Sequence, residues 1–164
     1  MRAGLVLKTL LFTLVMPGTV VGWLPWMLAF DGPRFRWIME GERHLLGVIP
    51  MAIGLMLYLW CAADFIRRGL GTPAPIDPPK HLVVQGLYRV TRNPMYVAMI
   101  TILAGEVVVS GSVSLAQYAA VVLAAFHAFV VFYEEPMLRA LFGDEYLAYA
   151  RRVPRWLWPV RTSS

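Results

Sequence analysis

The chain has 164 residues, of which 59% are hydrophobic and 15% are charged. A soluble domain carries about 25% charged residues, so this composition leaves too little polar surface to cover a core in water. The formal net charge of +5 is compatible with nucleic-acid binding, but the basic residues flank hydrophobic runs and form no continuous stripe. The composition therefore favours one membrane-embedded domain, residues 1–164, with membrane lipids as neighbours and no nucleic-acid partner.

The chain has few of the side chains that build disulfide or metal frameworks. Cys61 is the single cysteine, which excludes an internal disulfide, and the three histidines are scattered along the sequence. No group of these residues has the spacing of metal ligands, so we predict no metal site. Because Cys61 lies in an apolar run, we interpret it as a small buried hydrophobic residue.

Four uncharged hydrophobic runs follow one another along the chain. A helix of about 20 apolar residues crosses the hydrocarbon core of a bilayer, so each run is a candidate span. The expected spans cover about residues 5–30, 45–65, 94–110 and 113–134, and a tail follows at 135–164. The first run resembles a signal peptide, but it has no convincing small-residue cleavage site, so we interpret it as a retained helix. The predicted fold class is all-α: a multi-pass helical membrane protein with a tight hairpin at Ser110-Gly111-Ser112.

The distribution of basic residues predicts the orientation of these spans. If both termini lie in the cytoplasm, Arg34, Arg36 and Arg43 are the only basic residues in an outer segment, out of 15 Lys and Arg in total. This arrangement satisfies the positive-inside rule. It places the long loop before the third span and the tail together on the cytoplasmic face.

The first polar motif runs from Gly86 to Tyr96, where the third span begins. Asn93-Pro94 is a favourable helix start, with Asn as the N-cap and Pro at the first helical position. The N-terminus of a helix attracts anions, and the planar cation of Arg92 is suited to a carboxylate. On its own, the motif is also typical of a basic cytoplasmic loop with an aromatic belt.

The second motif is the pair Glu134-Glu135 at the cytoplasmic end of the fourth span. Adjacent carboxylates are common at a solvated helix end, but this pair opposes the basic trend of its membrane face. His127 lies seven residues before Glu134, two turns earlier on the same face of a regular helix. A histidine at membrane depth is a candidate functional group, and a hydrogen bond to a neighbouring helix explains it equally well. We assign no catalytic role to Glu106, near the outer end of the third span.

The third motif lies in the tail. Gly143 is expected to interrupt the helix, and Asp144 to begin a short helix that carries Tyr146 and Tyr149. Residues 151–159 combine arginines, tryptophans and prolines, as is typical of a segment at the depth of the lipid headgroups. Such a segment either anchors the tail or covers a site.

Together the motifs resemble those of the isoprenylcysteine carboxyl methyltransferases. Arg92-Asn93-Pro94-Met95-Tyr96, preceded by Gly86-Leu87-Tyr88, is similar to that family's arginine-histidine-proline-x-tyrosine signature. The family's C-terminal pattern is matched in order by Glu134-Glu135, Phe142-Gly143, Tyr146, Tyr149 and Val153-Pro154. The resemblance covers about residues 68–159 and extends to phospholipid methyltransferases and bacterial thiol methyltransferases. Asn93 departs from the signature, which has histidine at this position. An amide cannot titrate as a histidine does.

The resemblance implies S-adenosylmethionine as the cofactor, bound at the cytoplasmic ends of the last helices, and a lipidic substrate that arrives through the bilayer of a bacterial plasma membrane. It implies cofactor contacts by Gly86, Tyr88, Arg92, Asn93, Pro94, Tyr96, Glu134, Glu135 and Tyr146. The expected catalytic residues are Arg92, Glu134 and His127.

The expected reaction is methyl transfer to a lipidic or amphiphilic small molecule. A carboxylate or thiol acceptor is favoured, because a protonated amine needs a stronger base than the sequence offers. Phospholipid N-methylation and a non-enzymatic membrane assembly module are the open alternatives. A haem electron carrier is disfavoured because no two span histidines are placed to bind iron, and a transporter because no inverted repeat is visible. The sequence alone identifies neither the acceptor nor the oligomeric state, so cofactor binding is the property that discriminates among these functions.

Overall fold

The computed structural model describes residues 11, 13–29, 43–68 and 81–157, and this part of the chain contains helices and no strand. The all-α prediction is therefore confirmed. The elements are η1 (Thr19–Trp23), α2 (Leu24–Ala29), α4 (Arg43–Arg68), η2 (Gly86–Arg89), α5 (Pro94–Ser110), α6 (Val113–Phe129), η3 (Val130–Glu134) and α7 (Glu135–Arg152). Of these, η1 and η3 are π-helical turns and η2 is a turn of 3₁₀ helix.

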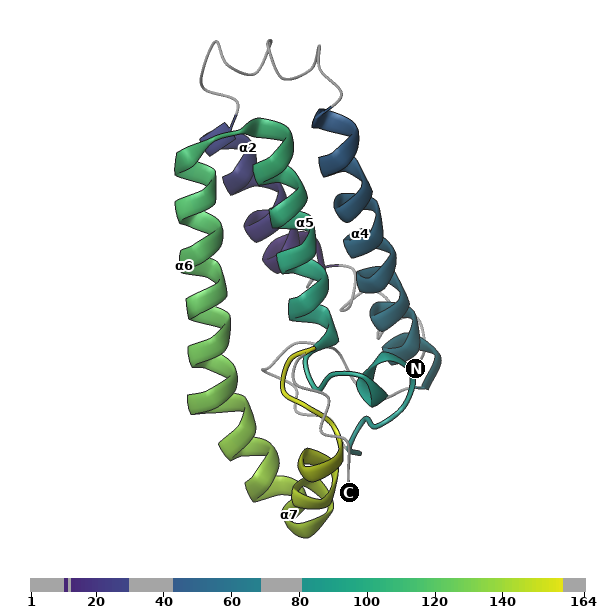
Figure 1. Ribbon diagram of the computed structural model, residues 1–164. Coiled ribbons are helices and arrows are strands. Elements are labelled where there is room, and N and C mark those ends of the chain that lie inside the picture. The colour runs from purple at the N-terminus through teal and green to yellow at the C-terminus, as the bar shows by residue number, and fades with distance from the viewer. Residues whose placement is uncertain (1–10, 12, 30–42, 69–80, 158–164) are drawn as a thin grey trace.

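Four apolar helices form a bundle in which α5 lies between α4 and α6 (Figure 1). Two of them, Leu45–Asp64 and the continuous helix Val113–Arg152, have the length and composition to cross a membrane. The other two, Thr13–Ala29 and Pro94–Ser110, are apolar and shorter. Each overlaps a predicted span, but the fourth helix continues to Arg152, past the predicted end at residue 134, and part of the first predicted span lies outside the described residues.

The outer surface of the bundle is strongly apolar. Leu14, Leu46, Val121 and Phe132 expose between 66% and 80% of their surface, and many other large hydrophobic side chains are exposed as well. A continuous apolar exterior of this kind is unfavourable in water and favourable in lipid. The exterior therefore agrees with the membrane setting that the composition predicts.

The closest helix packing is between α4 and α5, and glycines make it possible. A Cβ atom on Gly54 would lie 2.6 Å from the carbonyl oxygen of Ala98, and one on Gly105 would lie 2.5 Å from the carbonyl oxygen of Gly47. Small residues let helix backbones approach closely, which is the main source of attraction between helices in lipid. The first helix is held to this pair by a 2.9 Å hydrogen bond between the hydroxyl groups of Thr13 and Tyr58.

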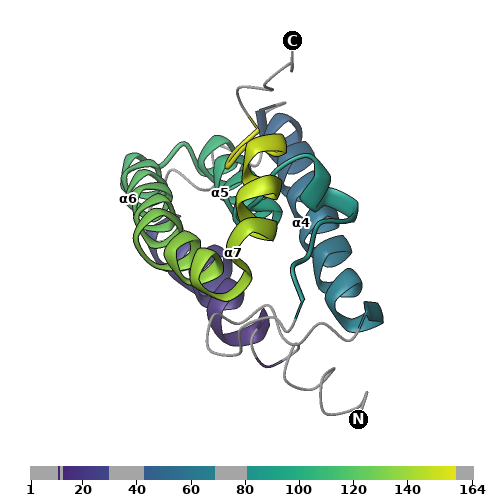
Figure 2. The ribbon, with the colours of Figure 1, turned by 90° about the horizontal axis from the view of Figure 1, so that it is seen from below.

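The α5–α6 connection and the polar motifs lie at opposite ends of the bundle (Figure 1). Gly111 ends α5 with a left-handed φ of 59°, and the Ser112 hydroxyl caps α6 by accepting from the Leu115 amide, which confirms the predicted hairpin. At the other end, η2, the start of α5 and α7 come together. Figure 2 shows α7 crossing this end of the bundle between α6 and α4.

The long C-terminal helix changes direction twice before it reaches the tail. The π turn η3 separates α6 from α7, and a π turn inserts an extra residue that alters the register of the following side chains. Within α7, Gly143 has the non-helical angles φ 49° and ψ −123°. The predicted break at Gly143 is confirmed, and it folds the second half of α7 back toward the start of α5 (Figure 1).

Candidate functional site

Asn93 stands at the start of α5 as predicted, but its side chain does not cap the helix. Pro94 occupies the first helical position, and the Val97 amide donates to the Asn93 carbonyl oxygen over 3.1 Å. The Asn93 side-chain amide instead donates through Nδ2 to the backbone carbonyl oxygen of Arg155, 2.9 Å away. The predicted position of the N-cap is confirmed, whereas the predicted capping hydrogen bond to Oδ1 is not formed, and the side chain is directed at Arg155 instead.

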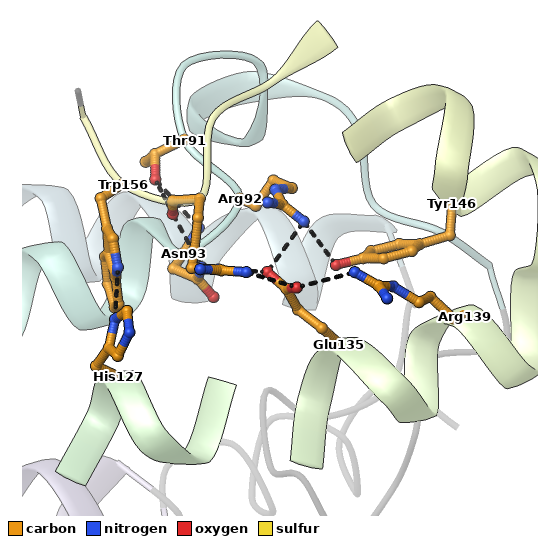
Figure 3. Close-up of polar contacts among 9 residues, drawn as sticks. Thr91, Arg92, Asn93, His127, Glu135, Arg139, Tyr146 and Trp156 are labelled. Atoms are coloured by element: carbon orange, nitrogen blue, oxygen red, sulfur yellow. Dashed lines mark hydrogen bonds and ion pairs between the residues drawn. The ribbon is translucent and has the colours of Figure 1, made fainter. Parts of the chain in front are cut away.

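The segment that contains Asn93 is paired with the segment that follows α7. The Arg92 amide donates to the Pro154 carbonyl oxygen over 3.0 Å, and the Thr91 hydroxyl donates to the Arg155 carbonyl oxygen over 3.0 Å. With the bond from Asn93, three hydrogen bonds join residues 91–93 to residues 154–155, and Figure 3 shows the two that side chains donate. We call residues 153–157 the tail segment. Its placement is therefore set by backbone pairing as well as by side chains.

Glu135 is the centre of an ion-pair cluster at the same place. Its side chain is 5% exposed and receives two bonds from Arg155, at 2.6 Å from Nε and 2.9 Å from Nη2. Arg92 Nη1 lies 3.1 Å from one carboxylate oxygen, and Arg139 Nη2 lies 3.4 Å from the other. Burial alone would raise the pKa of Glu135, but the bond from Arg155 and the charges of the three arginines outweigh burial and hold this pKa below its ordinary value.

The cluster has more positive than negative charge. Three guanidinium groups surround the one carboxylate of Glu135. The Arg92 side chain is only 12% exposed, donates to the Tyr146 hydroxyl over 2.9 Å and lies 5.9 Å above the Tyr146 ring. Its Nε atom is buried and has no hydrogen-bond partner within the described part of the chain. The Arg92 Nε–H can therefore donate one further hydrogen bond to an anionic or carbonyl oxygen.

Glu134 has different partners from its neighbour. The Tyr96 hydroxyl donates to its carboxylate over 2.5 Å, and the Tyr96 ring packs against Phe126 with 4.7 Å between the ring centroids. Both Tyr96 and Glu134 are half-buried. A half-buried carboxylate beside aromatic rings can attract a cation or accept hydrogen bonds from hydroxyl groups.

The turn η2 is tied to both α4 and α7. Gly86 has a left-handed φ of 61°, and a Cβ atom there would lie 2.5 Å from Oδ2 of Asp64 in α4. Any larger residue at this position would therefore collide with Asp64 as well as being strained. The Tyr149 hydroxyl donates to the Tyr88 carbonyl oxygen over 2.7 Å. Gly86 and Tyr88 thus lie at the same end of the bundle as the Glu135 cluster.

His127 does not occupy the position that the sequence predicts. The expectation placed it buried at membrane depth and on the same face as Glu134, two regular turns earlier. The residue is exposed, and its Nδ1 atom accepts a 3.2 Å hydrogen bond from the Trp156 indole of the tail segment (Figure 3). Because the π turn η3 lies between His127 and Glu134, seven residues no longer correspond to two α-helical turns.

The structure joins some of the candidate residues directly and leaves others nearby. Arg92 and Glu135 are in contact, Tyr146 contacts Arg92, and Asn93 is linked to them through Arg155. The residues that sequence reasoning missed are Thr91, Arg139 and Arg155. The i,i+4 spacing from Glu135 to Arg139 is a recognisable signal for an ion pair on a helix. No local pattern predicts the contacts of Arg155 with residues 62 and 64 positions earlier.

Comparison with known proteins gives one match. A family model described as phospholipid methyltransferase matches residues 42–145, from the start of α4 into the second half of α7. No curated protein and no solved structure shows significant similarity to the chain. The matched region includes Arg92, Asn93 and both glutamates, and it ends before the tail segment.

Proposed function

Because this chain belongs to the phospholipid methyltransferase family, a family of membrane methyltransferases, we propose that it transfers a methyl group from S-adenosylmethionine to a lipidic or amphiphilic small molecule. The observation that carries the proposal is the convergence of Arg92, Glu134 and Glu135, from two distant parts of the sequence, at one end of an apolar bundle. The excess of basic residues in the segments around this end supports a cytoplasmic location for it.

The chemical groups at this end fit the proposed cofactor. S-adenosylmethionine carries a sulfonium, an ammonium, a carboxylate and two ribose hydroxyl groups, and it supplies an activated methyl group. The Glu134 carboxylate, beside the Tyr96 ring, is suited to the cationic groups or the ribose hydroxyls. The Arg92 guanidinium has a buried Nε donor without a described partner and is suited to the carboxylate.

We assign the residues at the site the roles of orienting the acceptor and the cofactor and of excluding water, and no covalent step. Methyl transfer forms a bond between the acceptor and the methyl carbon while the bond from that carbon to sulfur breaks and its electron pair stays on sulfur. The residues at the site need to hold the acceptor in line and keep water away. The tail segment covers residues 91–93, and the buried ring of Tyr146 lies beside Arg92, so both support a site closed to water.

The acceptor class that we favour is a carboxylate or a thiol. A protonated amine must lose a proton before it can accept a methyl group, and a thiolate or carboxylate needs no such step. Of the candidate bases, His127 is already bonded to Trp156 and Glu135 is bonded to arginines. This leaves Glu134, which is bonded to Tyr96, as the candidate proton acceptor for an amine.

The second candidate is N-methylation of a phospholipid amine, and the matched family favours it by its description. This reaction would require Glu134 to accept the proton of the headgroup ammonium. A non-enzymatic membrane module is the alternative outside catalysis. The three functions differ in their products and in their need for the cofactor, so one set of assays separates them.

A methyl-transfer assay with the purified protein in lipid nanodiscs tests the proposal. Labelled S-adenosylmethionine is offered with fatty carboxylates, amphiphilic thiols and amine-headed phospholipids as separate acceptors. We expect transfer to a carboxylate or thiol, and a loss of about 100-fold or more in the Arg92→Ala variant because a charged group that orients the reactants is removed. Arg89→Ala, which removes an exposed arginine of η2, is the matched control and should retain activity. Transfer to the amine alone would support the second candidate, and full activity of Arg92→Ala would contradict the assigned role of Arg92.

A further inference from the structure

We propose that Asn93 is a positioning residue that holds the tail segment in place, and that the essential property of its side chain is hydrogen-bond donation to the tail. This inference rests on the proposed function, because the tail segment is taken to cover the cofactor site. It assigns residue 93 neither proton transfer nor direct contact with the methyl group. It also assigns Arg155 a role in the site, as the residue through which Asn93 acts.

The contacts of Asn93 are directed at the tail. The residue is 8% exposed, and its Nδ2 atom lies 2.9 Å from the Arg155 carbonyl oxygen. The Thr91 hydroxyl donates to the same oxygen over 3.0 Å, so both lone pairs of that carbonyl are used. A carbonyl oxygen can only accept, and for this reason the side chain that faces it must be a donor.

Arg155 transmits this contact to the ion-pair cluster. Its backbone is held by Thr91 and Asn93, while its guanidinium makes two bonds to Glu135. Glu135 also pairs with Arg92, which directly precedes Asn93 in the chain. The contacts therefore form a closed circuit from Asn93 through Arg155 and Glu135 to Arg92. If the Arg155 backbone moves away, Glu135 loses its shortest bonds and Arg92 loses a fixed partner.

The donor requirement makes specific demands on substitutions at residue 93. Aspartate has nearly the same shape as asparagine but only accepts hydrogen bonds at neutral pH, so it would repel the Arg155 carbonyl oxygen. Histidine carries a ring N–H that can donate to the same oxygen. This chemistry explains how an amide can stand where the similar signature has an imidazole, because both side chains offer an N–H donor.

The test compares Asn93→Asp, Asn93→His and the wild-type protein in detergent with two independent measurements. The first is the rate at which trypsin cleaves the Arg155–Trp156 bond, resolved by mass spectrometry, which reports whether the tail segment is docked. The second is the calorimetric affinity for S-adenosylhomocysteine. Thr91→Val, which removes the companion donor and also the acceptor of a 3.2 Å bond from the Asn93 backbone amide, is the second variant if Asn93→Asp fails to fold.

We expect Asn93→Asp to accelerate cleavage and to weaken binding by about tenfold or more, since the loss of a buried hydrogen bond and the new repulsion cost at least about 1.4 kcal/mol. Asn93→His should have the cleavage rate and the affinity of the wild-type protein. In a third measurement, the pH–rate profile of its methyl-transfer activity should overlie that of the wild-type protein between pH 6 and 8. A tail that stays protected in Asn93→Asp, or a new titration of activity in Asn93→His, would overturn the proposal. If the wild-type protein binds no S-adenosylhomocysteine, the proposed function fails, and the cleavage measurement alone decides whether Asn93 holds the tail.

Discussion

Glu134 and Glu135 are identical neighbours whose surroundings give them different properties. Glu135 is enclosed by the guanidinium groups of Arg92, Arg139 and Arg155, whereas Glu134 accepts from the Tyr96 hydroxyl. A buried carboxylate with several arginines contributes to stability only while it is ionised. We therefore assign Glu135 mainly to the assembly of the site and Glu134 mainly to the cofactor.

The first prediction concerns the pH dependence of the Glu135 contribution. Its pKa is lower in the folded protein than in the unfolded chain, so its stabilisation is present above the ordinary carboxyl pKa and is lost as pH falls through the lowered folded value. Glu135→Gln should lower the free energy of unfolding by on the order of 3 kcal/mol at pH 7.5, because three arginines lose their counter-charge. The difference in the free energy of unfolding between Glu135→Gln and the wild-type protein should narrow progressively as the pH falls below about 4.5.

Thermal unfolding in detergent at a series of pH values measures this difference. Glu145→Gln, which neutralises an exposed glutamate ten positions later in the same helix, is the control for loss of negative charge. A difference in the free energy of unfolding between Glu135→Gln and the wild-type protein that stays constant as the pH falls from 7.5 to about 3 would show that the carboxylate charge is not the source of its contribution.

At the scale of the elements, the α4–α5 pair is the rigid base on which the site is built. Arg92 and Asn93 directly precede α5, and Asp64 near the end of α4 meets Gly86 of η2. The glycines along the α4–α5 contact keep these two helices at a separation that no larger side chain would allow. The position of the first polar motif therefore depends on packing within the apolar part of the bundle.

The second prediction compares two glycines in helices. Gly54→Ala would place a Cβ atom 2.6 Å from the Ala98 carbonyl oxygen, whereas a Cβ atom on Gly22 would meet no atom of the described residues within 4 Å. Both substitutions gain helix propensity, by up to about 1 kcal/mol. The difference in stability between the two variants therefore measures the cost of the close contact at Gly54. We expect Gly54→Ala to be less stable than Gly22→Ala by about 1–3 kcal/mol, as measured by thermal unfolding in the same detergent. Equal stability of the two variants would contradict the close packing of α4 on α5.

Local signals in the sequence predict the helices well and the tertiary contacts poorly. Pro94 and Gly111 mark the ends of α5, and the bounds Pro94–Ser110 agree with the predicted span 94–110. The π turn η3 has no comparable signature, since its first residues, Val130 to Phe132, continue the apolar run of α6. For this reason His127 and Glu134 are not two regular α-helical turns apart as predicted, and the helix that begins at Val113 continues past the predicted end of the fourth run at residue 134.

In the described part of the chain, the whole bundle is apolar on its outside, and its ion-pair cluster lies at one end. The hydrophobic runs predict the bundle because lipid requires each span to satisfy its own backbone hydrogen bonds. The order of the motifs predicts which residues gather at the end of the bundle that holds the start of α5 and α7. The hydrogen bonds between residues 91–93 and the tail segment lie beyond such reasoning, because they join parts of the chain that are about 60 positions apart and depend on the break at Gly143.

The central claim is that the end of the bundle with Arg92 and Glu134 binds S-adenosylmethionine. Calorimetric titration of S-adenosylmethionine and S-adenosylhomocysteine into the wild-type protein, Glu134→Gln and the control Glu145→Gln tests it most directly. We predict micromolar binding to the wild-type protein and the control, and binding at least about tenfold weaker in Glu134→Gln, because a charged hydrogen-bond acceptor is lost. Absence of binding to folded, lipid-supplemented wild-type protein, or equal binding to all three proteins, would contradict the claim.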